Sequence, residues 1–144
     1  MRWLQKLLRF ALLRYHYNLL IGEDGWHGGI MLAQGVGIDF RNLGGIYLSD
    51  GSFKRLEAIE IEYAEVETLA GRGLAHTVTF PKRWIVRAQA EEATLEYRGT
   101  RESPAAHIAR DMIYFDFRFT GTYREPGKRE RFLNGHGYGE YVEM

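Results

Sequence analysis

Cysteine is absent from this sequence of 144 residues, and proline occurs only three times. Without cysteine the chain has no disulfide framework and no thiol nucleophile. Neither sign of charge is in excess, because 19 Lys and Arg residues balance 19 Asp and Glu residues, so no global field favours a nucleic acid. A glycine-rich nucleotide loop, a nucleophile elbow and the ligand spacing of a metal site are also missing. These absences argue against phosphoryl transfer and metallohydrolase chemistry, and no cofactor or metal is expected.

The chain is instead rich in glycine and aromatic residues, with 17 glycines and 14% Phe, Trp and Tyr. This composition is typical of many strands joined by tight turns. After Gly25 apolar and polar residues alternate almost to the C-terminus, most clearly from Ile59 to Tyr63 and from Ile113 to Phe119. Eight or nine strands without a βαβ unit predict an antiparallel, lipocalin-like β-barrel over residues 22–144.

Two helices are expected beside this barrel. Leucine and aromatic residues recur at three- and four-residue intervals over 2–20, which predicts an amphipathic helix within residues 1–21. Its apolar stripe is expected to pack on the barrel, and the alternative is that Arg2, Lys6, Arg9 and Arg14 dock it on an anionic membrane. A second, short helix over 104–110 is predicted because Ser103 suits an N-cap and Pro104 the first helical position.

The location that follows from these features is cytoplasmic, with peripheral membrane contact through residues 1–20 as a possibility. Arg9 and Arg14 interrupt the apolar run of a signal peptide. The uninterrupted apolar stretch is also far too short for a transmembrane helix.

Three ionisable residues are candidate catalytic groups, because alternation places them among apolar neighbours where burial shifts pKa values. His76 shares its strand face with Leu74 and Val78, and the alternative is a core histidine bonded to a carbonyl or a tyrosine. Glu140 is in phase with apolar neighbours on the last strand, so it is either a buried acid or a rim carboxylate. Asp116 is the third candidate; if the phenylalanine stripe faces inward, Asp116 is exposed and pairs with Arg118.

A cluster of aromatic residues is predicted to line a cavity for a greasy or polycyclic ligand. The interior of an eight-stranded barrel is just wide enough to be filled by side chains or to hold one small ligand, so ordinary core packing is the alternative. The expected ligand-contacting residues are Trp26, Tyr63, Trp84, Phe115, Phe117 and Tyr138.

Three segments of the chain resemble the carotenoid hydratase and tocopherol cyclase group. They are Phe80-Pro81-Lys82-Arg83-Trp84, Tyr114-Phe115-Asp116-Phe117 and Gly135-His136-Gly137-Tyr138-Gly139-Glu140-Tyr141. Members of that group look like paired lipocalin-type barrels, and this chain has room for one, similar to their C-terminal barrel. The resemblance implies a hydrophobic, isoprenoid- or polyketide-like ligand. Tyr114 is also among the expected ligand contacts. The group's Trp-Asp-His-x-x-Trp-Gly signature has only the partial counterpart Gly25-Trp26-His27-Gly28-Gly29.

The leading hypothesis is a small cofactor-independent enzyme that holds a hydrophobic substrate in its barrel. It would promote cyclisation, isomerisation or hydration, with Glu140 or His76 as the acid and Tyr63 or Tyr138 as a hydrogen-bonding helper. The rival is a non-catalytic carrier of a lipid or pigment. A third alternative is a homodimer in which a second copy replaces the second barrel of the resembling group.

Overall fold

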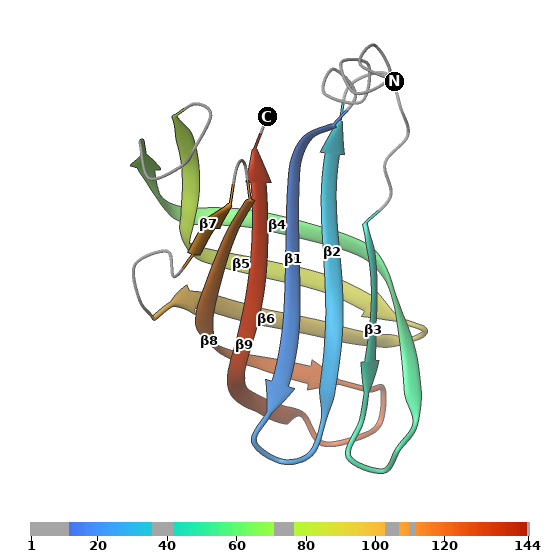
Figure 1. The fold of residues 1–144 in the computed structure, drawn as a ribbon. Helices are drawn as coiled ribbons and strands as arrows, with labels where there is room; N and C mark the ends of the chain where they lie inside the picture. Colours follow the sequence, from blue (N-terminus) through green and yellow to red (C-terminus); the bar gives the residue numbers. More distant parts are fainter. Residues whose placement is uncertain (1–11, 36–41, 71–76, 103–106, 110–111, 144) are drawn as a thin grey trace.

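The computed structural model describes residues 12–35, 42–70, 77–102, 107–109 and 112–143, and these ranges form nine antiparallel β-strands (Figure 1). The alternating pattern that predicted strands from Ile59 to Tyr63 and from Ile113 to Phe119 falls within two of the longest, β4 and β8. The strands are β1 (Leu12–Gly22), β2 (His27–Gly35), β3 (Leu43–Tyr47), β4 (Phe53–Leu69), β5 (Val78–Ala90), β6 (Ala93–Arg101), β7 (His107–Ala109), β8 (Met112–Arg124) and β9 (Arg131–Glu143).

The sheet closes on itself into a barrel. Its strand order is β6-β5-β4-β3-β2-β1-β9-β8-β7, and a further pairing of β6 with β8 joins the two ends. The short β7 pairs only with the start of β8, so the other eight strands form the ring. The prediction of an antiparallel, lipocalin-like barrel is therefore confirmed. Closure pairs each of these eight strands with a neighbour on both sides over at least part of its length.

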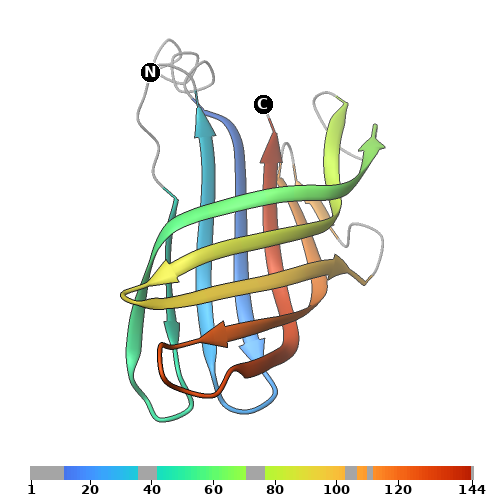
Figure 2. The same cartoon turned by 180° about the vertical axis from the view of Figure 1, so that it is seen from behind.

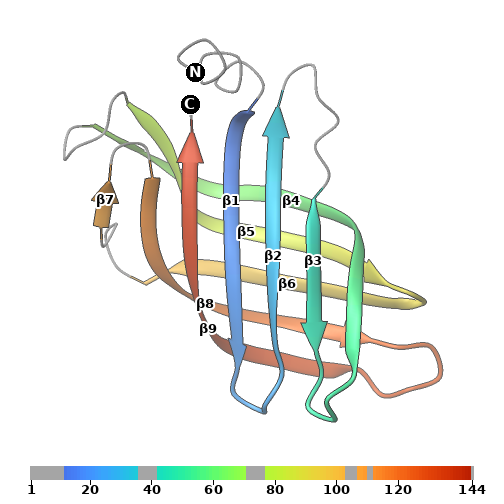
Figure 3. The ribbon, with the colours of Figure 1, turned by 45° about the vertical axis from the view of Figure 1, so that its right-hand side comes forward.

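Strand β4 connects the two walls of the barrel. It first runs beside β3 and then crosses over to pair with β5. There it faces the wall made by β9, β1, β2 and β3, in front of that wall in Figure 2 and behind it in Figure 3. The pairing register of β4 with β5 shifts between Glu57 and Glu60, where Ala58 has a positive φ of 48°. A bulge of this kind bends a strand, and here it turns β4 from one wall to the other.

The two expected helices are wrong wherever the structure describes their residues, which contain no helix. Residues 12–20 belong to β1, which pairs on one side with β2 and on the other with β9. Residues 107–109 form β7 rather than part of a helix over 104–110. The remaining parts of both expected helices, residues 1–11 and 104–106 with 110, lie outside the described residues. No helix among the described residues could span a membrane.

Large rings inside the barrel lie over glycines of the neighbouring strand. Three inward phenylalanines of β8 face three inward glycines of β9, and a Cβ on any of these glycines would come within 2.1–2.6 Å of the facing ring. The pairs are Phe115 with Gly139, Phe117 with Gly137 and Phe119 with Gly135. The close fit gives the interior the density of a packed core.

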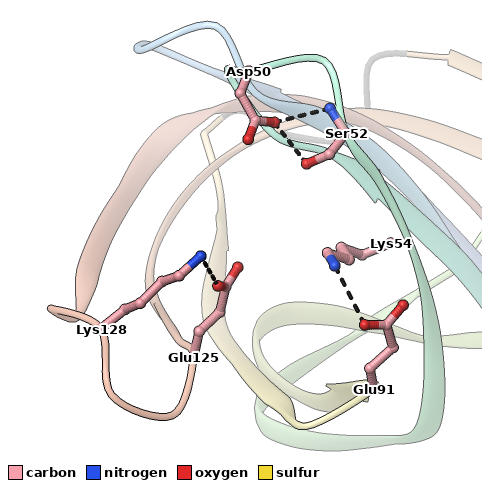
Figure 4. A network of polar contacts seen from close by, with 6 residues as sticks. All are labelled: Asp50, Ser52, Lys54, Glu91, Glu125 and Lys128. Carbon is pink, nitrogen blue, oxygen red and sulfur yellow. Dashed lines mark hydrogen bonds and ion pairs between the residues drawn. The ribbon is translucent and has the colours of Figure 1, made fainter.

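Polar side chains are confined largely to the outer wall and the turns. Glu60 and Glu62 of β4 face water, as their alternation with isoleucines predicted. The expected turn at residues 50–52 is present, and there Asp50 Oδ1 accepts hydrogen bonds from the Ser52 amide at 2.8 Å and the Ser52 hydroxyl at 2.6 Å (Figure 4). Lys54 pairs with Glu91 close by. These exposed contacts contribute little individually, so stability comes mainly from the aromatic interior.

Gly137→Ala tests this packing. The added methyl would lie 2.3 Å from Phe117 Cζ and 2.4 Å from the Leu19 carbonyl oxygen, and backbone cannot move aside cheaply. We expect a loss of about 3 kcal/mol in the free energy of unfolding, measured by urea titration. Gly29→Ala is the control, because its methyl would meet only the flexible Tyr17 side chain, at 3.2 Å. Equal stability of the two variants would contradict the ring-over-glycine account.

Candidate functional site

Two polar side chains of β1 point into the barrel. His16 and Asn18 are both 0% exposed, and they share the inward face of β1 with Leu20. His16 lies opposite Leu32 of β2 and Tyr141 of β9 in the strand ladders. A buried polar side chain is costly unless it is hydrogen-bonded, so the partners of these two residues define the site.

Asn18 is held by two donors from the opposite wall. The indole Nε1 of Trp84 and the hydroxyl of Tyr97 both donate to Asn18 Oδ1, each at 3.0 Å. An indole nitrogen can only donate, so this contact identifies the oxygen of the carboxamide. The Asn18 Nδ2 group is buried and has no hydrogen-bond partner among the described residues. It is available to a water molecule or to an acceptor on a ligand.

His16, two residues before Asn18 on the inner face of β1, lies in an aromatic enclosure. Its Nδ1 is 3.1 Å from the hydroxyl of Tyr63 on β4. The Trp84, Phe115 and Tyr141 rings lie with centroids 5.1, 5.7 and 5.7 Å from the imidazole centroid. Histidine is the commonest general acid or base in proteins, and a hydrogen-bonded phenol can orient its ring. This pair is the part of the described inner wall best suited to acid–base chemistry.

Tyr63 reaches His16 because of the bulge in β4. The bulge at Ala58 leaves Ile59 buried and Ile61 and Tyr63 half-buried against the core. Without the extra residue, alternation from the inward Leu56 would place position 63 on the outer face.

The predicted ligand-contacting residues divide between the two faces of the barrel. Trp84, Phe115 and Tyr63 surround His16, while Phe117 packs on Trp84 with ring centroids 5.1 Å apart. Trp26 is buried against Phe119 in a separate part of the core. The remaining two, Tyr114 and Tyr138, lie on the outer wall with 38% and 51% of their surface exposed.

The predicted catalytic residues are not brought together at His16. Glu140 is half-buried on the outer face of β9, in phase with the exposed Tyr138, because the glycines between them take the inner face. Asp116 is exposed, and the ion-pair partner of Arg118 is Glu102. His76 lies outside the described residues. Catalytic roles for these three stay predictions, and Glu140 and Asp116 do not face the core.

Sequence reasoning missed His16, Asn18 and Tyr97. The first two fell within the expected helix, where neither would have faced a core. Their signal was alternation with Tyr15, Tyr17 and Leu19, but the usual polarity was inverted. These three residues lie on the outer face of β1, and the polar His16 and Asn18 lie on the inner face. No three His, Cys, Asp or Glu residues of the described part gather as metal ligands.

Comparison with known proteins gives a likeness in fold. No protein-family model matches the chain, and no curated protein matches it in sequence. Among solved structures the chain is similar to kievitone hydratase from Nectria haematococca, with a TM-score of 0.68 and 13% sequence identity. The match covers 92% of this chain and 40% of that one, so this chain spans less than half the length of its structural neighbour. At this identity the likeness shows a shared barrel fold.

The buried phenol of Tyr97 gives a test of the polar cluster. Burial, reinforced by nearby Tyr63, raises the pKa of Tyr97 well above its ordinary value of 10.0. The folded state thus keeps a proton that the unfolded chain releases, and this stabilisation is fully present below pH 10.0 and lost as the pH rises further. We expect Tyr97→Phe to lower the free energy of unfolding at neutral pH by about 1 kcal/mol, because it removes the hydrogen bond to Asn18. Its free energy of unfolding should fall less steeply than that of the wild type in alkaline solution.

Urea titrations across the alkaline range measure both effects. Tyr138→Phe is the control, because that side chain is exposed on the outer wall. Parallel pH profiles for the wild type and Tyr97→Phe would contradict a buried, protonated Tyr97.

Proposed function

We propose that the barrel binds an apolar, ring-bearing small molecule beside His16 and Tyr63 and adds water to it, or removes water from it, by proton transfer. The hydrogen-bonded His16–Tyr63 pair inside an aromatic enclosure is the observation that carries this proposal. Aromatic side chains with a few fixed polar groups are typical of small-molecule sites.

The chemistry follows from the imidazole. His16 takes a proton from the water that attacks one carbon of a substrate double bond, whose π bond breaks, and then gives a proton to the other carbon. One C–H bond and one C–OH bond form, and the imidazole ends in the state in which it began. Tyr63 is a positioning residue, since its hydroxyl at Nδ1 fixes the ring and its tautomer.

Kievitone hydratase supports testing hydration before cyclisation or isomerisation. It shares the barrel, and its name states a hydration. The aromatic enclosure around His16 suits a flat substrate, because rings stack on or edge against one another.

A carrier is the second candidate. It is favoured by one observation, the position of Glu140 and Asp116 on the outer wall, which leaves few acid–base groups at the inner face of the described strands. A carrier would bind the same kind of molecule at the same rings without converting it.

Incubation with kievitone tests the proposal directly. We expect product heavier by one water in mass spectra, and quenching of the fluorescence of Trp84, which touches His16. His16→Asn should lower turnover by about 100-fold or more with binding retained. Tyr63→Phe should have a smaller effect, and His136→Asn on the outer wall serves as the control.

The other outcomes separate the rival accounts. Quenching without product supports the carrier. Loss of turnover in His76→Asn but not in His16→Asn moves the acid–base role to His76 and contradicts the assignment to His16. Absence of quenching by kievitone and by the aromatic probes described below removes the ligand site altogether.

A further inference from the structure

An arginine lies on the inner face at the end of β6. Alternation places Arg101 in the same phase as the buried Leu95, Tyr97 and Gly99, and only 6% of its side chain is exposed. A fully charged arginine in such a position is rare unless its donors are satisfied.

The Arg101 guanidinium makes two contacts within the protein, an ion pair and a cation–π contact. One Nη2 hydrogen is donated to Glu67 Oε1 in a short ion pair. The guanidinium carbon lies 4.5 Å from the centroid of the Phe80 ring, which is a cation–π contact. The Nη1 group is buried and has no hydrogen-bond partner among the described residues.

This unsatisfied donor belongs to the same aromatic layer as His16. The Phe80 ring under Arg101 contacts Phe115 and Tyr141 with centroids 5.2 and 5.6 Å away. Those two rings also flank the His16 imidazole. A ligand in contact with these rings, which meet edge to face or at steep tilts, would have the guanidinium at one side and the imidazole at the other.

We infer that Arg101 Nη1 binds an uncharged carbonyl oxygen of the ligand. A buried donor without a partner is destabilising, and an acceptor oxygen relieves it. Because Glu67 already neutralises the guanidinium, a second anion would leave a net negative charge in a largely buried site. A ketone satisfies Nη1 without that cost. The inference deepens the proposed function and rests on it, since it names the chemical class of the ligand in the same site.

The role also fits the proposed chemistry. A carbonyl conjugated to the substrate double bond would be polarised by the guanidinium, which stabilises the negative charge that develops on oxygen as water adds. Arg101 would then touch the substrate at a point remote from the proton that His16 transfers.

Three fluorescent dimethylaminonaphthalenes that differ in one substituent, a propionyl ketone, a carboxylate or a hydrogen, provide the test. We expect the wild type to bind the ketone about tenfold more tightly than the hydrogen-substituted probe, as a hydrogen bond to a charged donor allows. The carboxylate should bind more weakly than the ketone. The hydrogen bond should shift the emission of the ketone bound to the wild type to the red of its emission when bound to Arg101→Met.

Two variants test whether Arg101 and its charge cause the preference for the ketone. Arg101→Met keeps an apolar chain on Phe80 and should abolish the preference for the ketone while the hydrogen-substituted probe still binds. Glu67→Gln removes the neutralising charge and should make the carboxylate the tightest of the three probes. Because Glu67 is 37% exposed, this variant is expected to fold even if Arg101→Met does not.

The failures are distinguishable. If the hydrogen-substituted and ketone probes bind wild type equally, or if Glu67→Gln leaves the order of the probes unchanged, Arg101 is a structural residue and the inference is overturned while the ligand site stands. If no probe binds the wild type, the ligand site and the proposed function fail together. Near-ultraviolet circular dichroism checks the fold of each variant.

Discussion

The arrangement of the interior depends on the pairing of large rings with glycines. An eight-stranded barrel encloses little more than the volume of its own inward side chains, so a phenylalanine or tryptophan needs a neighbour without a side chain. Phe117 lies on Gly137, and Trp84 lies on Gly99 so closely that a Cβ there would be 2.3 Å from its ring. These contacts hold the rings against the wall, and for Trp84 they fix the direction of the indole Nε1.

The polar cluster follows from that orientation. With the Trp84 ring on Gly99, its Nε1 is directed to the opposite wall and needs an acceptor, which Asn18 provides. Asn18 then also accepts the Tyr97 hydroxyl, and strand alternation places His16 on the same face. The inward polarity of β1 is thus coupled to packing on β5 and β6, from strands that are distant in sequence.

This coupling explains what the sequence could and could not predict. Alternation was sufficient for the barrel, for the acids of β4 and for the inward stripe of β8, because those patterns follow burial. It was insufficient for β9, where the inward residues are glycines and carry no apolar signal, so that Glu140 was kept as a candidate buried acid beside the alternative of a rim carboxylate. It failed for β1, where Leu19 and Tyr17 face outward and the apolar spacing imitated a helix. Both departures come from positions at which tertiary contacts reverse the usual burial of side chains.

The polar groups inside the barrel also carry an argument about function. Leucine at position 16 would fill a barrel of this kind without the cost of burying an imidazole. An apolar residue at position 101 would remove the need for a largely buried ion pair. Barrel closure and the ring-over-glycine packing require neither His16 nor Arg101, whereas Asn18 accepts the Trp84 and Tyr97 donors. Asn18 Nδ2 and Arg101 Nη1 are two of the buried polar atoms without a hydrogen-bond partner in the described part of the chain, and Trp26 Nε1 and the Tyr123 hydroxyl are others. The ligand proposed above, bound between His16 and Arg101, would account for two groups that reduce stability and lie beside the same cluster of rings.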